Sequence, residues 1–170
     1  MRMDGKREME NKTDQVYMTL ALQQAALALA TGDVPVGAVI VKDGEVIAAA
    51  CNRREADGLA TAHAELLCVE AACRHLGRWR LSDCTLYVTL EPCPMCAGAL
   101  INARIGRVVY GAKDAKAGAC GSVIQMDAYP LNHRLRAEGG VMAQQCAALL
   151  SEFFEKKRSH KNNAKENEHE

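Results

Sequence analysis

The apolar residues in the first part of the chain recur at the spacing of an amphipathic helix. This pattern predicts a helix from about residue 14 to residue 30, capped at its start by Thr13 or Asp14 and ended by Gly32. Its apolar face would be formed by Val16, Leu20 and Leu27. Residues 1–13 are polar and contain no apolar signal core, so we expect an extension outside the folded domain and a cytoplasmic protein.

Two apolar runs rich in β-branched residues follow, at 34–41 and 46–51. The residues between them include Asp43-Gly44, a pair that favours a tight hairpin turn. We therefore expect the two runs to be antiparallel neighbours in a sheet.

The rest of the chain alternates between helical and strand patterns. The expected elements are a helix at 61–76 capped by Thr61, a strand at 84–90, a helix at 95–102 with Pro94 in its first turn, and a strand at 108–110. A glycine-rich loop at 111–121 precedes a short helix near Asp127, a weak strand within 134–142 and a helix at 143–158. The polar residues 159–170 are expected to be disordered.

This order of elements predicts the α/β class. A helix, a hairpin and then alternating strands and helices favour a three-layer α/β/α sandwich with a mixed sheet of about five strands. A chain of 170 residues suits one domain, which we place at 14–158. No apolar run approaches the roughly 18 residues that would suggest a membrane span.

The residues with the clearest chemistry are two cysteines and a histidine. Cys93 and Cys96 lie three apart near an expected helix start, which places both sulfurs on one side. His63, near another helix start, supplies a third ligand for zinc and leaves one tetrahedral position for water. Both motifs fall at the edge of the sheet where ligands bind in α/β folds.

Glu65 lies two residues after His63 and would handle the protons of that water. Residues two apart on a helix point about 200° apart, so both can face one point only where the helix begins. Because two thiolates neutralise Zn²⁺, this metal should acidify its water less than a site of three neutral histidines, and an adjacent base is needed more. Glu65 is the only acidic residue of either motif, so it would take the proton of the water and return protons to the ring nitrogen and the departing amine.

Two other interpretations of these residues are a closed structural zinc site and a redox pair of cysteines. A structural site needs four protein ligands, and no further cysteine or histidine lies close to either motif in the sequence. A redox pair would leave His63 and Glu65 without a role. The combination of H-x-E with P-C-x-x-C is instead the known signature of zinc-dependent nucleobase deaminases.

Several segments resemble the bacterial tRNA-specific adenosine deaminase family, and together they span about 14–158. The shared segments are 33–41, 61–65, 86–93, 95–100, 104–112 and 132–134. The segments that discriminate this family from related deaminases are 114–122, 132–134 and 147–154.

The resemblance implies a cytidine deaminase-like fold and a protein that binds one Zn²⁺ per chain and converts the wobble adenosine of a tRNA anticodon to inosine. It also implies a homodimer, which we expect to be built around the apolar helix at 95–101 and the edge at Arg104-Ile105 that follows it. It also implies a set of substrate-binding residues. Asn52 would contact the flipped base, Lys113 and Asp114 would contact flanking nucleotides, and Phe154, Lys157 and Arg158 would lie beside the anticodon loop. Ala64 is a further expected substrate contact. From the residues alone, Asn52 is typical of a turn after a strand, and one of the two neighbouring phenylalanines is expected in the core.

Two features leave other substrates open. Pro94, between the cysteines, also occurs in deaminases of guanine and other free bases, and the formal net charge of zero lacks the basic footprint typical of RNA enzymes. The alternatives are therefore a small-molecule deaminase of guanine or cytosine, and a non-catalytic RNA-binding subunit with structural zinc. The intact Glu65 argues against the second.

Overall fold

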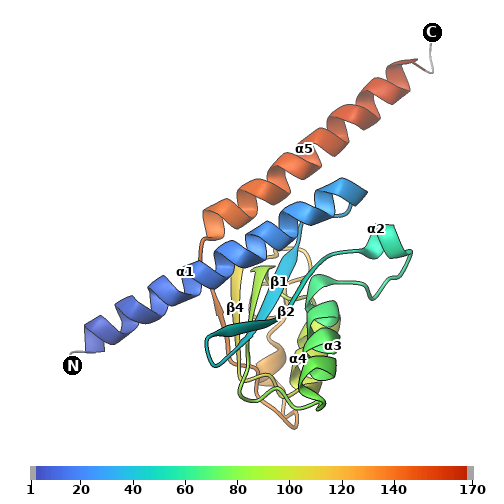
Figure 1. Ribbon diagram of the computed structural model, residues 1–170. Helices are drawn as coiled ribbons and strands as arrows, with labels where there is room; N and C mark the ends of the chain where they lie inside the picture. The colour runs from blue at the N-terminus through green and yellow to red at the C-terminus, as the bar shows by residue number, and fades with distance from the viewer. Residues whose placement is uncertain (1–2, 168–170) are drawn as a thin grey trace.

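The computed structural model describes residues 3–167 and consists of a sheet with helices on both faces (Figure 1). The helices are α1 (Met3–Ala28), α2 (Arg54–Asp57), α3 (Ala64–Leu76), α4 (Pro94–Asn102) and α5 (Ala143–Asn167), with short 3₁₀ turns at Leu29–Thr31 and Met126–Ala128. The strands are β1 (Gly37–Lys42), β2 (Glu45–Cys51), β3 (Thr85–Leu90), β4 (Arg107–Ala112) and β5 (Ala137–Gly139). Among the described residues, no helix is both long and apolar enough to cross a membrane.

The sheet has five strands in the order β2-β1-β3-β4-β5. β1 is antiparallel to β2 and β3, whereas β3, β4 and β5 are parallel, so the sheet is mixed as predicted. The predicted hairpin turn is confirmed by the positive φ angles of Asp43 (50°) and Gly44 (82°), the combination that a two-residue turn of this kind requires.

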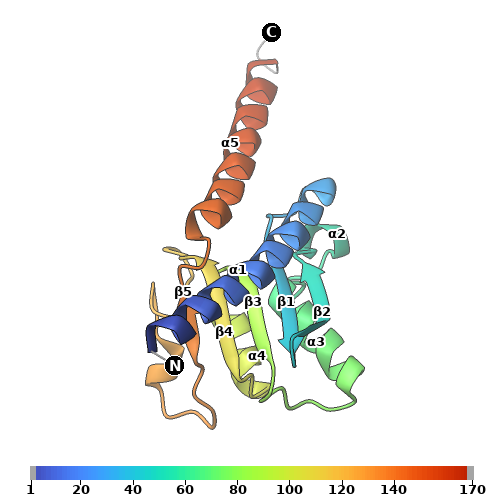
Figure 2. The ribbon, with the colours of Figure 1, turned by 60° about the vertical axis from the view of Figure 1, so that its left-hand side comes forward.

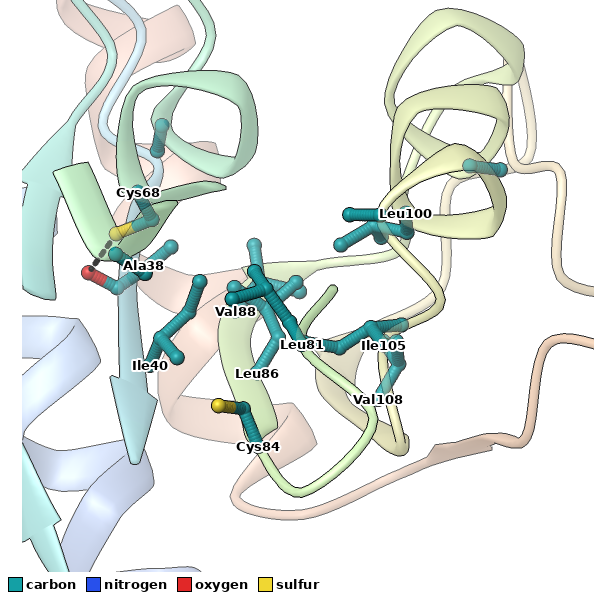
Figure 3. Close-up of a cluster of buried hydrophobic side chains, with 14 of the residues drawn as sticks. Ala38, Ile40, Cys68, Leu81, Cys84, Leu86, Val88, Leu100, Ile105 and Val108 are labelled. Carbon is teal, nitrogen blue, oxygen red and sulfur yellow. Dashed lines mark hydrogen bonds between the residues drawn. The ribbon is translucent and has the colours of Figure 1, made fainter. Parts of the chain in front are cut away.

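Helices cover the sheet on both sides, which confirms the three-layer sandwich (Figures 1 and 2). Alternate strand residues point to opposite faces. One set packs against α3 and α4 and includes Ala38, Ile40, Leu86, Val88 and Val108 (Figure 3). The other set packs against α1 and α5 and includes Val39, Val41, Tyr87 and Val109.

The prediction for the first helix was wrong in its start and in its buried face. The helix begins at Met3, so it includes most of the predicted extension, and the Thr13 hydroxyl donates to the Met9 carbonyl instead of capping. Val16 and Leu27 are exposed, at 60% and 58%, whereas the third predicted residue, Leu20, is partly buried and packs against the core as expected.

The face of α1 that packs on the sheet is made of small residues because the two backbones approach closely. A Cβ added at Gly37 of β1 would lie 2.2 Å from the Ala21 carbonyl oxygen and from the Ala25 amide nitrogen. Ala21, Ala25 and Met18 are accordingly fully buried. Large apolar residues on this face would push the helix away from the sheet.

Asp14, predicted as a cap, instead lies buried between α1 and the sheet. Its carboxylate accepts a hydrogen bond of 2.8 Å from the Tyr87 hydroxyl and a bidentate pair of 2.8 and 2.9 Å from Arg107. Arg107 also pairs with Glu138 on β5. This network ties α1 to three strands of the sheet.

The expectation of a disordered tail at 159–170 is corrected for 159–167, since α5 continues to Asn167, and residues 168–170 lie outside the described part. The tail contains strong helix formers such as Lys161, Ala164 and Glu166, which favour continuation of a helix that is already nucleated. The start of α5 packs beside β4, and its C-terminal half extends away from the sheet in both views (Figures 1 and 2).

Candidate active site

The ligating atoms of His63, Cys93 and Cys96 converge, all lying within 4.8 Å of one another. The Nδ1 atom of His63 is 3.7 Å from the Cys93 sulfur and 3.5 Å from the Cys96 sulfur. A tetrahedral zinc with ordinary Zn–N and Zn–S bond lengths separates such N and S atoms by about 3.6 Å. The three residues therefore fit a zinc ion without rearrangement.

Two helix starts produce this convergence. His63 and Cys93 are the residues immediately before α3 and α4, both with extended backbone angles. Pro94 occupies the first helical position, as predicted, and places Cys96 in the first turn of α4. The helix after His63 begins at Ala64 instead of near Thr61. His63 and Glu65 therefore lie at a helix start, as their separation by two positions requires if both are to face one point.

The two thiols differ strongly in acidity. The hydrogen bond from Cys96 lowers the pKa of Cys93 to about 4, and the same bond together with burial raises the pKa of Cys96. The hydrogen bond to Cys93 also raises the pKa of His63. The low pKa of Cys93 favours its thiolate form, and a bound cation would favour loss of the proton from Cys96 as well.

Glu65 is in the first turn of α3 and only 4% exposed. Burial raises the pKa of its carboxyl to about 7, against an opposing effect of its backbone hydrogen bond and of His63. A carboxyl with a pKa near neutrality can both accept and release a proton under ordinary conditions.

A pocket opens over these residues and brings together several of the predicted substrate contacts. It is lined by residues from five parts of the chain: Asp33, Val34, Val36, Asn52, Arg54, Glu55, His63, Ala64, Glu65, Leu90, Glu91, Cys93, Asp114 and Ala117. Asn52, Ala64 and Asp114 therefore lie where the sequence analysis expected substrate. The apolar members suit a planar ring, and the polar ones lie around it.

Asn52 also has the turn role expected from its position after a strand. Its side-chain amide donates to the Val34 carbonyl at 3.1 Å and accepts from the Arg54 amide at 3.2 Å. One N–H and one acceptor position of the side chain remain for a ligand.

The other predicted contacts do not line the pocket. Lys113 is exposed, one residue before Asp114, and the carboxylate of Asp114 accepts from the amides of Lys116 and Ala117. On α5, Phe154 is 41% exposed and packs edge-on against Phe153, which is half-buried. Neither ring belongs to the two core clusters, so the expectation that one of the pair lies in the core was wrong. Lys157 and Arg158 are exposed, and the Lys157 ammonium lies 5.7 Å from the Phe153 ring.

Two buried carboxylates that shape the pocket were missed by the sequence analysis. Asp33 accepts from the amides of Glu55 and Ala56, at 2.6 and 3.1 Å, and so holds α2 in place. Although burial pushes its pKa upward, hydrogen bonds from Thr31 and these amides outweigh that effect and leave the pKa below its usual range. Glu91 accepts a hydrogen bond from the amide of Asp114, a residue of another wall of the pocket. A signal was present, since each is an acidic residue beside an apolar strand segment.

Comparisons with known proteins agree with this geometry. The MafB19-like deaminase family matches residues 12–158. The chain is 45% identical over 155 residues to a tRNA-specific adenosine deaminase of Bacillus subtilis, covering 91% of this chain and 96% of that protein.

Solved structures give the same picture. One from a study of A-to-I editing by tRNA:A34 deaminases at the wobble position of transfer RNA is 44% identical, with a TM-score of 0.77, and covers 79% of this chain and 98% of its own. A guanine deaminase from Bacillus subtilis is 42% identical, with a TM-score of 0.55, over 58% of this chain and 63% of its own.

Proposed function

This chain belongs to the tRNA-specific adenosine deaminase family, and from that premise we propose that it hydrolyses the wobble adenosine of a tRNA anticodon to inosine with one Zn²⁺ per chain. The observation that carries the proposal is the buried Glu65 beside the convergent His63, Cys93 and Cys96, at a pocket with apolar walls. Because tRNA is a cytoplasmic substrate in bacteria, we place the reaction in the cytoplasm.

His63, Cys93 and Cys96 would hold the zinc, which when bound supplies a water that loses a proton readily and attacks the ring carbon bearing the amine. The chain's own contribution is proton transfer by Glu65. Its carboxylate takes one proton from the water, delivers it to the adjacent ring nitrogen, and then transfers the remaining hydroxyl proton to the departing amine, which leaves as ammonia. The raised pKa of Glu65 suits both directions of transfer.

Asn52 and Ala64 would position the flipped base. Asn52 lines the pocket and keeps one donor and one acceptor position unused, and Val34, Val36 and Leu90 offer apolar surface to the ring. A base taken out of its stack is held in this manner by hydrogen bonds to its edge and by apolar contacts to its faces.

The decisive experiment is a comparison of substrates with the purified protein. We expect an anticodon stem-loop carrying adenosine at the wobble position to be deaminated faster than free adenosine, guanine or cytosine. Faster turnover of free guanine would establish the small-molecule alternative. The similarity of this chain to a solved guanine deaminase is the reason to test that substrate. Zinc and RNA binding without any turnover would establish the non-catalytic one.

We expect the basic residues of α5 to act on RNA affinity. Lys157 and Arg158 are exposed, beside the exposed ring of Phe154, and so offer charge for phosphates and an aromatic surface for a base. Changing Lys157 and Arg158 to alanine should raise KM for the stem-loop severalfold and reduce its dependence on salt, with zinc content unchanged.

A matched control for this variant is Arg74→Ala with Arg80→Ala, which removes one exposed arginine in the last turn of α3 and one in the segment that follows it. These residues pair with Glu70 and stack on Trp79. Equal KM and salt dependence for wild type and the α5 variant would exclude this pair as an RNA contact.

We also propose a homodimer centred on α4, with a change to the predicted surface. Ile105 is fully buried in the core and cannot face a partner, whereas Met95 is 36% exposed. α4 contacts the 3₁₀ turn Met126–Ala128, and three exposed apolar side chains flank that turn in the sequence: Val123, Tyr129 and Leu131. Exposed apolar residues gathered in this way are typical of an interface between subunits.

Light scattering should therefore give twice the chain mass at micromolar concentration, and Tyr129→Glu should shift the protein toward monomer. Val46→Glu is the matched control, because Val46 is similarly exposed on the edge strand β2. A monomeric wild type would contradict the proposed dimer.

A further inference from the structure

Glu91 is one of the few charged side chains buried in the described part of the protein, at 1% exposure. It follows β3 and precedes Cys93 by two residues. Its own amide donates to the Ala112 carbonyl at 2.8 Å, which fixes its position at the ends of β3 and β4. The carboxylate therefore occupies a defined point between the zinc-ligand segment and the loop that follows β4.

That loop is folded around the carboxylate. One oxygen of Glu91 accepts from the amides of Cys120 and Ser122, at 3.0 and 3.1 Å. The other accepts from the amide of Asp114, at 3.0 Å, and from the Ser122 hydroxyl. The four contacts use the four acceptor positions of a carboxylate. Glu91 thus has no acceptor left for substrate or water, which excludes it as a general base.

The fit between carboxylate and loop is also sterically tight. A Cβ added at Gly118 would lie 2.5 Å from the carboxyl carbon and one oxygen of Glu91, and 2.6 Å from the Asp114 carbonyl oxygen. The Ala119 amide donates to the Pro92 carbonyl at 2.9 Å, directly before the zinc ligand Cys93. The Glu91 carboxylate and the backbone of the next residue, Pro92, therefore both contact the segment 114–122.

This segment carries one wall of the pocket, through Asp114 and Ala117. We propose that Glu91 is a positioning residue that holds the wall formed by 114–122 at a fixed place relative to Cys93, so that the nucleotides flanking the target base are bound in register with the reacting centre. The identity of the substrate as RNA rests on the proposed function. The positioning of 114–122 by Glu91 rests only on the contacts of Glu91.

Glu91→Gln tests the proposal, because a glutamine directs an NH₂ group at amides that are themselves donors. Losing a charge-assisted hydrogen bond shifts a local equilibrium by roughly tenfold or more. We therefore expect KM for the stem-loop to rise about tenfold or more, kcat to change less than about threefold, and zinc to stay at about one per chain. Amide hydrogen exchange at Asp114, Cys120 and Ser122 should accelerate at least about tenfold.

Gly118→Ala is a second variant in which the segment 114–122 should separate from Glu91. Its added methyl group would displace the segment while the carboxylate stays intact. It should reproduce the rise in KM and the faster exchange, and it decides the matter if Glu91→Gln fails to fold. Glu138→Gln is the control, since Glu138 is a carboxylate that pairs with Arg107 and contributes nothing to the pocket. This control should leave KM and exchange in 114–122 unchanged.

The proposal is overturned if exchange at the three amides is unchanged in both variants, or if KM stays at the wild-type value while the loop opens. A wild type that prefers free guanine would overturn the substrate assignment instead. The positioning role of Glu91 is then tested only by amide hydrogen exchange, which is measured without any substrate.

Discussion

Glu65→Gln should lose turnover by about 10⁴-fold or more while keeping its fold, its zinc and its affinity for the stem-loop. A single general acid–base step typically contributes 10² to 10⁴-fold, and Glu65 is assigned several proton transfers in one cycle. Glutamine has nearly the same size and can still form hydrogen bonds, but it cannot take up a proton. The loss should therefore appear in kcat at saturating stem-loop.

The stability of the variant separates this chemical role from a structural one. Glu65 is almost completely buried, and burial disfavours its charged form. Replacing it with a neutral amide removes that cost, so we expect a melting temperature no lower than that of the wild type. A lower melting temperature with proportionally lost activity would point to a structural residue.

Glu70→Gln is the matched control on the same helix. Glu70 is exposed and pairs only with Arg74, one turn further along α3. It should retain wild-type kcat and KM. Activity of Glu65→Gln within about tenfold of wild type would remove Glu65 from the mechanism.

The elements that the sequence predicted correctly are those determined by local patterns. The Asp43-Gly44 turn, the strand alternation around β3 and Pro94 at the start of α4 each depend on neighbours within a few residues. The relation of His63 to Glu65 is of the same kind, because residues two positions apart can face one point only where a helix begins. These local rules were enough to determine the layers of the fold.

The errors arose where a distant contact decides the outcome. The buried face of α1 is selected by its close approach to Gly37, and that contact favours alanines over the larger Val16 and Leu27. No pattern within the helix contains this information. The amphipathic period predicted a helix, but the sheet determined which face it buries.

The candidate site shows the same division. The ligand set follows from spacing, whereas the roles of Asp33 and Glu91 depend on backbone amides of residues 22 to 31 positions away. Amides carry no residue identity, so a sequence pattern cannot indicate which carboxylate will bind them. For Lys157 and Arg158 the proposed partner is RNA, and the chain by itself shows only that they are exposed and carried by a projecting helix.

Removal of the metal should abolish turnover altogether. Metal analysis of the purified protein should give about one zinc per chain, and a strong chelator should eliminate deamination, which added Zn²⁺ restores. The basis is the 3.5 and 3.7 Å separations of the His63 nitrogen from the two sulfurs, which match a tetrahedral ion. Turnover that persists after complete removal of zinc would contradict the proposed mechanism.

Substitution of the ligands identifies which residues hold the ion. Cys96→Ser should lose most of the bound zinc and with it the activity, because serine is a poor zinc ligand and Cys96 is fully buried within the group. Cys73→Ser is the control, since Cys73 lies outside the group and donates only a long, weak bond to the Trp79 carbonyl. A cobalt-substituted protein should show the absorption of two sulfur ligands. A spectrum of four sulfurs would instead identify a closed structural site, in which no position is left for water and Glu65 has no proton to move.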